Sequence, residues 1–184
     1  MKCYGKDIHV LMSATAIQER IGEMAATISR DYAGKEITLI GVMKGALFFL
    51  VDLAKAIDLP VTIELLGVSS YQGQTKTSEN VHITHDIDRR LNGRHVILVE
   101  DIVDTGLTMQ FLLQTLQFRH PASLKSAVLL TKPTCAKVTV PVDYTGFHID
   151  DVFVVGYGMD FQERYRNLPF IGVIHAMPPA LSCL

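Results

Sequence analysis

The sequence contains little cysteine, little proline and no excess of either charge. Its 184 residues include 3 Cys, 7 Pro and no Trp, and the formal net charge is -2. Cys3, Cys135 and Cys183 are far apart and lack C-x-x-C spacing, which argues against a disulfide framework and a structural zinc site. We therefore expect free thiols in the cytoplasm, a reducing compartment. Because no basic excess is present, we do not expect binding to nucleic acid.

Long apolar runs are missing as well. The longest, residues 46–51, ends at Asp52, far short of the roughly 20 residues that a membrane-spanning helix needs. Residues 1–10 contain no apolar core of a signal peptide, so we expect neither secretion nor membrane insertion. Hydrophobic residues nevertheless make up 48% of the chain, which excludes a disordered chain and predicts one folded domain over residues 1–184.

The apolar residues fall into short segments with helix or strand spacing. Ile17, Ile21, Met24, Ala25 and Ile28 predict an amphipathic helix over residues 13–31. Similar patterns predict helices over 46–57 and 107–118, and strands over 37–42, 61–68, 94–99, 124–130 and 152–155. Nearly continuous apolar strands separated by helices are typical of an α/β fold with a parallel sheet covered on both faces. Such sheets bind ligands at the carboxyl ends of their strands.

Residues 69–80 contain no aliphatic side chain. A segment that cannot bury itself is expected to be exposed and mobile. It is either an ordinary surface loop or a lid that becomes ordered over a ligand.

Three carboxylates follow the predicted strand 94–99 within five residues. Glu100 and Asp101 are adjacent and can accept hydrogen bonds from the two vicinal hydroxyls of a ribose. Carboxylates at the end of a buried strand require hydrogen-bond donors or a cation. Mg²⁺ suits a site made only of oxygen ligands, whereas the closest histidine pair, His82 and His85, is expected at the surface.

Residues 104–108, Asp-Thr-Gly-Leu-Thr, lead from these carboxylates into the predicted helix 107–118. Gly106 permits a close approach of the backbone, Thr105 and Thr108 add hydroxyl donors, and free amides at a helix amino terminus bind phosphate. Together with Glu100 and Asp101, this turn predicts a site for a ribose 5-phosphate. The alternative, in which Asp104 only caps the helix, explains neither the acidic pair nor the threonines.

Residues 99–108 closely resemble the 5-phosphoribosyl-1-pyrophosphate (PRPP) motif of type I phosphoribosyltransferases. Over residues 8–174 the chain resembles the hypoxanthine(-guanine) phosphoribosyltransferase branch of that family. The matching segments are Met-Lys-Gly 43–45, Ser-Ser-Tyr 69–71, Thr-Lys-Pro 131–133, Phe-Val-Val-Gly-Tyr-Gly-Met-Asp 153–160 and Arg-Tyr-Arg-Asn-Leu 164–168.

The resemblance implies the family's fold, a parallel twisted sheet flanked by helices. It also implies a small hood contributed by the terminal segments and a mobile lid at about residues 69–85. The implied activity is purine salvage: transfer of the 5-phosphoribosyl group from PRPP to hypoxanthine, and to guanine, which gives IMP or GMP and pyrophosphate. The resemblance further implies a homodimer or homotetramer, in which the apolar segment 46–57 serves either an interface or the core.

The resemblance also implies roles for individual residues. Asp104 is the catalytic acid/base at N7 of the purine, and Mg²⁺ is held by Glu100, Asp101 and Asp160. Besides these four carboxylates, the implied substrate contacts are Lys44, Gly45, Ser70, Tyr71, Thr105, Gly106, Leu107, Thr108, Lys132, Phe153, Val154 and Arg166. In relatives the peptide bond before the residue matching Lys44 is often cis.

Among these residues, Lys132 predicts the choice of base. An ammonium donates hydrogen bonds but cannot accept them, so it favours a 6-oxopurine over adenine. Phe153 offers a ring for stacking or belongs to the core, and Lys44-Gly45 binds pyrophosphate or forms an ordinary turn. Leu107 stands where some relatives have lysine, so we expect backbone amides to hold the phosphate.

Two other functions compete with this hypothesis. The first is a phosphoribosyltransferase that prefers xanthine or guanine. The second is a regulator that keeps the same fold, senses nucleotides and binds RNA. The regulator needs a basic face, whereas the chain has 17 Lys and Arg against 19 Asp and Glu.

Overall fold

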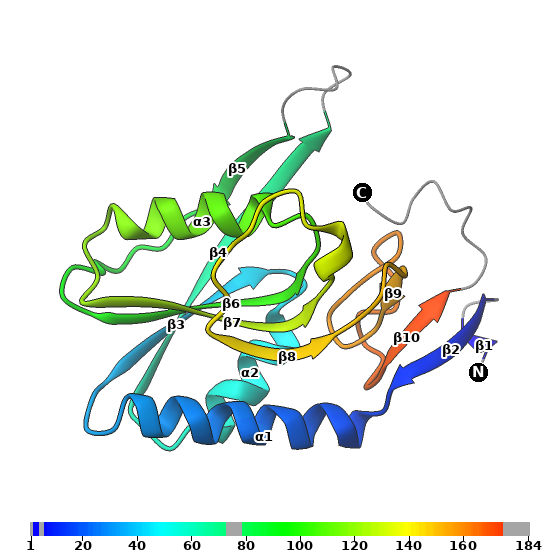
Figure 1. Ribbon diagram of the computed structural model, residues 1–184, viewed down its shortest axis with the longest axis horizontal. Helices are drawn as coiled ribbons and strands as arrows, with labels where there is room; N and C mark the ends of the chain where they lie inside the picture. Colours follow the sequence, from blue (N-terminus) through cyan, green and yellow to red (C-terminus); the bar gives the residue numbers. More distant parts are fainter. Residues whose placement is uncertain (1, 4–5, 73–78, 175–184) are drawn as a thin grey trace.

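The computed structural model describes residues 2–3, 6–72 and 79–174, with side chains over residues 8–69 and 81–174. This part of the chain forms two β-sheets and three α-helices (Figure 1). The larger sheet has the order β5-β4-β3-β6-β7-β8, with β3 (Ile37–Met43), β4 (Val61–Gln72), β5 (Glu79–His85), β6 (His95–Val103), β7 (Ser123–Thr131) and β8 (Tyr144–His148). The smaller sheet has the order β1-β2-β10-β9, with β1 (Lys2–Cys3), β2 (Lys6–Met12), β9 (Val154–Val155) and β10 (Ile171–Ile174).

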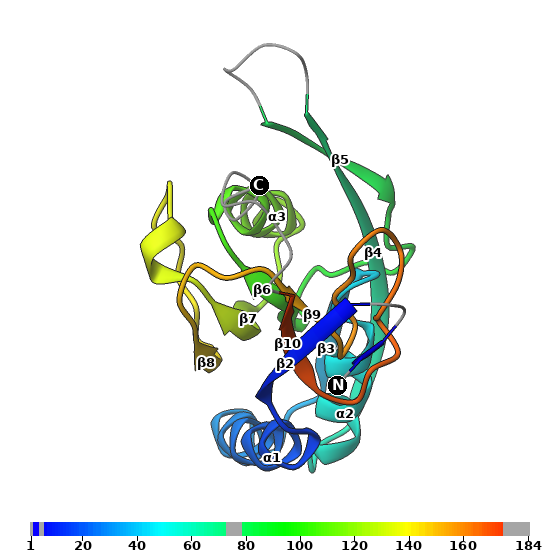
Figure 2. The same cartoon turned by 90° about the vertical axis from the view of Figure 1, so that its right-hand side faces the viewer.

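The larger sheet is mostly parallel and carries helices on both faces. β3 pairs in parallel with β4 and β6, β6 with β7, and β7 with β8, whereas β4 and β5 are antiparallel. α1 (Ala14–Asp31) and α2 (Leu47–Ala56) cover one face, and α3 (Leu107–Gln117) covers the other (Figures 1 and 2). The predicted α/β fold is therefore confirmed.

Apolar side chains point alternately to the two faces of the central strands and form a hydrophobic core on each face of this sheet. Leu39 and Ile97 pack with α1 and α2, whereas Ile40 and Leu98 pack with α3. Successive side chains of a strand point to opposite faces, so a strand buried on both faces must be apolar throughout. This is the reason that these strands are almost continuously apolar.

α1 matches its prediction closely. Ser13 caps the helix, and its Oγ accepts a hydrogen bond from Ala16 N at 3.2 Å. The buried side chains are the five that carry the helical spacing: Ile17, Ile21, Met24, Ala25 and Ile28. α2 and α3 begin or end within one residue of the predicted positions.

β6 is longer than predicted, and this places the acidic residues differently. Residues 100–103 stay in the strand because their pairing with β7 continues, with Glu100 opposite Val128 and Val103 opposite Thr131. Glu100 and Asp101 therefore belong to the last part of β6 instead of following it.

The segment 69–80 is not simply a loop, which corrects the expectation based on its polar side chains. β4 runs to Gln72 and pairs antiparallel with β5, with Ser69 opposite His82 and Gln72 opposite Glu79. Backbone hydrogen bonds hold this arm together, so it needs no aliphatic side chains there. In Figure 2 the arm extends beyond α3.

The prediction of a core strand over residues 152–155 was wrong about the length of the strand and about the sheet to which it belongs. Only Val154 and Val155 form a strand, and β9 pairs with β10 in the smaller sheet. The edge of the larger sheet beside β7 is β8 instead. The smaller sheet joins β1 and β2 from the beginning of the chain to β9 and β10 from its last part, and Figure 1 shows it beside the larger sheet.

None of the helices in the described ranges combines the length and the apolar character that crossing a membrane would require.

Candidate active site

The carboxyl ends of β3, β6 and β7 meet at one edge of the larger sheet. Lys44 follows β3, Asp104 follows β6, and Lys132 follows β7. These strands are neighbours and run parallel, so the residues after them converge. Lys132 N also donates to the Val103 carbonyl at 2.9 Å, which ties the two strand ends together.

Glu100, which is partly buried, and Asp101, which is buried, form an acidic pair near the end of β6. Burial raises the pKa of Glu100 well above its ordinary value, and the charge of Asp101 raises it further. Burial also raises the pKa of Asp101, although hydrogen bonds and the charge of Arg166 oppose that shift. Among the described residues, the buried Oε2 of Glu100 has no hydrogen-bond partner. A cation or the hydroxyls of a sugar would satisfy this pair.

The turn at residues 104–108 is built around Gly106. Its φ of +84° lies in the left-handed region, and a Cβ added there would lie 2.7 Å from the Val138 carbonyl oxygen. The Thr105 carbonyl accepts hydrogen bonds from Lys137 N and Val138 N, which hold the turn in place. α3 begins at Leu107, within this segment, so the first amides of the helix have no acceptors within the helix. The predicted phosphate contacts Thr105, Gly106, Leu107 and Thr108 thus lie at a helix amino terminus.

Asp104 and Lys132 are in direct contact. Lys132 Nζ donates to Asp104 Oδ2 at 3.2 Å and also lies 3.5 Å from Asp151 Oδ1. The Lys132 side chain is only 4% exposed. The other carboxylate oxygen of Asp104 is buried and has no hydrogen-bond partner among the residues that the structure describes. One oxygen of Asp104 is therefore held by Lys132, and the other is available to a ligand.

The Lys44-Gly45 turn packs directly against the acidic strand. The Met43-Lys44 peptide bond is cis, as the resemblance implies. A Cβ at Gly45 would overlap the Asp101 carboxylate, and a Cβ at Gly158 would overlap the Gly45 carbonyl. Only glycine fits where these three segments meet, so residues 43–45, 100–101 and 156–159 form one side of the site.

Asp160 and Arg166 lie in the irregular segment between β9 and β10. Arg166 Nη2 is 2.7 Å from Asp160 Oδ1, and Arg166 Nη1 donates to the Gly158 carbonyl at 2.8 Å. The buried Nε of Arg166 has no partner in the described part of the chain. The same part of the chain contains no group of three or more His, Cys, Asp or Glu side chains that could hold a metal ion. Glu100, Asp101 and Asp160 are thus not assembled as a three-carboxylate cluster.

The remaining predicted residues lie in two places. Phe153 is partly buried and packs edge-on against Phe161, with 5.8 Å between the ring centroids, and the buried Val154 pairs with Val173. Ser70 and Tyr71 are part of strand β4, but the structure describes only their backbone.

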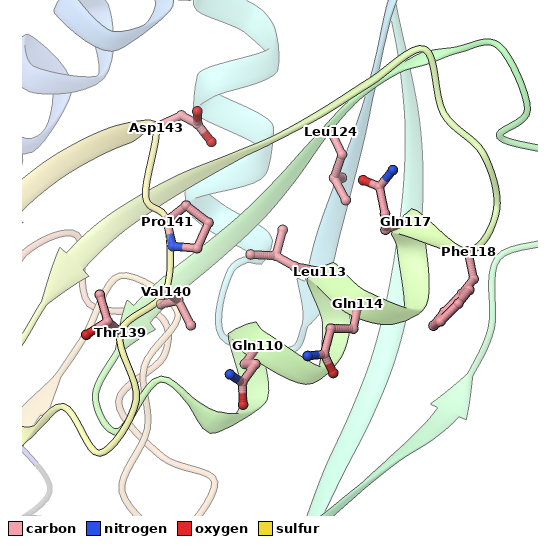
Figure 3. A pocket seen from close by; sticks show the side chains of 10 residues that line it. All are labelled: Gln110, Leu113, Gln114, Gln117, Phe118, Leu124, Thr139, Val140, Pro141 and Asp143. Carbon is pink, nitrogen blue, oxygen red and sulfur yellow. The ribbon is translucent and has the colours of Figure 1, made fainter.

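A separate groove of about 450 Å³ lies between α3 and residues 139–143 (Figure 3). Its lining residues are Gln110, Leu113, Gln114, Gln117, Phe118, Leu124, Thr139, Val140, Pro141 and Asp143. None of them is a predicted site residue, so this groove is distinct from the candidate active site.

Residues 12–162 match the sequence profile of the phosphoribosyl transferase domain. The chain belongs to the phosphoribosyltransferase family. It is 46% identical over 171 residues to a hypoxanthine-guanine phosphoribosyltransferase of Mycobacterium avium, which covers 90% of this chain and 84% of that protein. It is also 42% identical over 170 residues to a hypoxanthine phosphoribosyltransferase of Haemophilus influenzae, with 91% and 95% covered.

A solved structure agrees with these sequence matches. A hypoxanthine-guanine phosphoribosyltransferase from Bacillus anthracis is 44% identical and superposes with a TM-score of 0.88, over 91% of this chain and 99% of that chain. The resemblance of the motifs to this branch of the phosphoribosyltransferases is therefore confirmed.

Two residues in this phosphoribosyltransferase site were not predicted from the sequence. Asp151 approaches Lys132, and Glu163 Oε2 accepts a hydrogen bond from Lys44 Nζ at 2.9 Å. Asp151 directly precedes the predicted strand 152–155, and an acidic residue at such a boundary is the only signal that could have indicated it. Glu163 lies 119 residues from Lys44 and has no sequence signal that we recognise.

Proposed function

We propose that this protein is a phosphoribosyltransferase of purine salvage that transfers the 5-phosphoribosyl group from PRPP to hypoxanthine and guanine. The products are IMP or GMP and pyrophosphate. The observation that carries the proposal is that three features meet at one end of the larger sheet: the Glu100–Asp101 pair, a helix amino terminus after Gly106, and the Lys132–Asp104 contact. The names of the relatives support the same activity.

The acidic strand end and the turn after it would bind the sugar phosphate. The amides of residues 105–108 donate to the 5-phosphate, and the neutral Leu107 leaves this task to the backbone. Glu100 and Asp101 accept from the 2- and 3-hydroxyls of the ribose. These contacts fix C1 of the sugar beside Asp104, so that the reacting atoms are held in position.

Asp104 and Lys132 would act on the purine. O6 and N7 lie next to each other on one edge of a 6-oxopurine, and Lys132 Nζ and Asp104 Oδ2 are neighbours in the protein. Lys132 donates to O6, whereas the unpartnered oxygen of Asp104 accepts the proton that N7 loses as another ring nitrogen attacks C1 and pyrophosphate departs. Phe153 and the backbone of Val154 would contact the ring.

Mg²⁺ fits the acidic pair. Burial raises the pKa values of both Glu100 and Asp101, and a bound cation would favour their charged forms. In proteins Mg²⁺ is commonly bound by one or two carboxylates together with substrate phosphates, which requires no cage of three protein ligands. When bound, Mg²⁺ would neutralise the charge of the departing pyrophosphate. Asp160 is a further candidate ligand, although its carboxylate pairs with Arg166.

Pyrophosphate itself would bind to Lys44, Gly45 and Arg166, with Ser70 and Tyr71 of the arm closing over it. We propose the arm, at about residues 69–85, as a lid and the smaller sheet as a hood over the purine. Closure would exclude water from the cation-like C1 centre. The proposed location is the cytoplasm, and no nucleic acid or membrane takes part.

We also propose a homodimer or homotetramer. Leu47, Phe48 and Val51 on α2 are 36%, 40% and 43% exposed, which is high for large apolar side chains on a helix next to the site. Light scattering after gel filtration would give a dimer or tetramer mass, whereas a monomer would overturn this point.

An assay of pyrophosphate release tests the proposed function. Hypoxanthine, guanine, xanthine and adenine are each supplied with PRPP, with and without Mg²⁺. We expect Mg²⁺-dependent release with hypoxanthine and guanine, and little with adenine. Preferred use of xanthine would select the alternative specificity. No release with any base would contradict the proposal.

A further inference from the structure

The turn between Asp160 and Arg166 holds one glutamate in an unusual backbone conformation. Gln162 and Glu163 have φ values of +53° and +60°, in the left-handed region that residues other than glycine seldom adopt. Phe161 and Arg164 exchange two backbone hydrogen bonds of 3.1 Å, and Asp160 Oδ2 accepts from Glu163 N at 2.8 Å. Backbone of this kind persists only where its surroundings hold it, and it clusters at functional sites.

This turn presents the carboxylate of Glu163 to two cations. Oε2 accepts from Lys44 Nζ at 2.9 Å, and Oε1 lies 3.3 Å from Arg166 Nη2. Lys44 comes from the turn after β3 and Arg166 from the segment before β10, so Glu163 bridges separate parts of the molecule. A surface cavity of about 550 Å³ borders residues 163–167.

These contacts are easily exchanged with solvent or a ligand. The side chains of Lys44 and Glu163 are 61% and 67% exposed, and exposed ion pairs contribute little net free energy. A carboxylate with one oxygen on each cation also makes the same kind of contacts as two oxygens of a phosphate group.

We propose that Glu163 is an internal competitor for the pyrophosphate subsite. It occupies Lys44 and Arg166 when the subsite is empty, and the pyrophosphate group of PRPP displaces it. This inference rests on the proposed function, which gives Lys44 and Arg166 to pyrophosphate. It adds a residue that tunes the affinity of that subsite and favours the release of pyrophosphate after the reaction.

Competition of this kind should weaken pyrophosphate binding by a measurable factor. A ligand that binds only the fraction of molecules with free cations has its apparent dissociation constant raised in inverse proportion to that fraction. For exposed ion pairs of ordinary strength, the expected effect is about three- to tenfold. We expect no effect on the purine subsite, because its proposed contacts, Lys132 and Asp104, pair with each other, and Lys132 also pairs with Asp151.

The test is calorimetric titration of the full-length protein with pyrophosphate in the presence of Mg²⁺. We expect Glu163→Gln to tighten pyrophosphate binding about three- to tenfold. Glu23→Gln is the matched control, since Glu23 is 66% exposed, pairs with Arg20 and carries the same charge change outside the site. In the steady state, Glu163→Gln should lower KM for PRPP and leave KM for hypoxanthine unchanged.

A second variant separates direct contact from a general effect of charge. Glu163→Asp keeps the charge but is one methylene shorter, so it cannot bridge both cations. The proposal expects its pyrophosphate affinity to lie between those of the wild type and Glu163→Gln. An affinity of Glu163→Asp equal to the wild type would overturn the competition by contact.

Two further results have distinct meanings. If the wild type binds pyrophosphate and Glu163→Gln binds it no tighter, this inference fails and the proposed function stands. If neither the wild type nor Glu23→Gln binds pyrophosphate, the proposed function fails, and the inference fails with it.

Discussion

The ammonium of Lys132 lies 3.2 Å from Oδ2 of Asp104, and the two residues follow neighbouring parallel strands. This contact occupies one carboxylate oxygen and leaves the other, which is buried, without a partner in the described residues. A base-reading donor and a proton acceptor therefore stand side by side, which is the arrangement that a 6-oxopurine edge requires.

Replacing the acid/base should separate chemistry from binding. We expect Asp104→Asn to lower kcat by about 10²-fold or more, the range of a positioned acid/base, because an amide cannot exchange the proton at N7. The amide oxygen can still accept from Lys132, so the melting temperature should change little. Steady-state kinetics and thermal unfolding measure both quantities. A kcat within threefold of the wild type would remove Asp104 from the catalytic role.

Removing the ammonium should affect the base more than the sugar donor. We expect Lys132→Ala to raise KM for hypoxanthine more than KM for PRPP, because the proposed function gives Lys132 a contact with the purine and none with PRPP. The variant also leaves Asp104 and Asp151 without a buried counter-charge, at a cost of about 3 kcal/mol or less, since both carboxylates stay partly exposed. Kinetics with each substrate varied in turn, together with urea unfolding, measure these effects. Equal increases in the two KM values would argue against base reading by Lys132.

The phosphate turn can be tested at its glycine. Gly106 and Gly93 both have left-handed backbone, with φ of +84° and +72°, but only Gly106 has a neighbouring atom, Val138 O, close to the position of a Cβ. Each Gly→Ala change should cost about 1–2 kcal/mol for the backbone alone. Gly106→Ala should cost more and should also raise KM for PRPP, whereas Gly93→Ala should leave that KM unchanged. The same loss of stability and an unchanged KM in both variants would contradict the close packing of this turn.

A hydrogen bond outside the site predicts a dependence of stability on pH. Asp52 Oδ2 accepts from Tyr157 Oη and Gln18 Nε2, both at 2.6 Å. Burial alone would raise the pKa of Asp52, but these two hydrogen bonds and the neighbouring Lys55 ammonium together outweigh it and lower the pKa below its ordinary value. The resulting stabilisation is present above the unfolded pKa of about 3.9 and is lost as the pH falls through the lower folded value.

Asp52→Asn should therefore lower the free energy of unfolding by about 1 kcal/mol at pH 7. The difference from the wild type should shrink below about pH 4, because the wild-type carboxylate then becomes protonated. Urea unfolding at neutral and acidic pH measures it. A difference that grows on acidification would show that the carboxylate is not stabilised in the folded state. The contact matters for the site because Tyr157 precedes Gly158, which packs against Gly45.

The parts of the fold that were predicted are those with apolar periodicity. The helix at Ile17 to Ile28 and the central strands bury most of their side chains, so hydrophobic spacing indicates them. β8 has mostly half-buried side chains, and the arm formed by β4 and β5 is held through its backbone, so neither leaves an apolar pattern. The β9 and β10 pair was missed because its strands are short and lie far apart in the sequence.

In the site, too, some residues could be predicted from the sequence and others could not. Residues 100–108 are contiguous, so the sequence presents their chemistry in one stretch, and the motif is specific enough to identify its family. The contacts of Lys132 with Asp151 and of Lys44 with Glu163 depend on tertiary folding. Exposed or isolated charges show no periodicity, so only the structure reveals which of them meet.

The central claim is that the turn after β6 holds a sugar phosphate. A crystal structure of the protein soaked with IMP and Mg²⁺ tests it most directly. The account predicts the 5-phosphate within hydrogen-bond distance of the amides of residues 105–108, the ribose hydroxyls on Glu100 and Asp101, and the purine beside Lys132 and Asp104. A nucleotide bound elsewhere, with this turn empty, would contradict it.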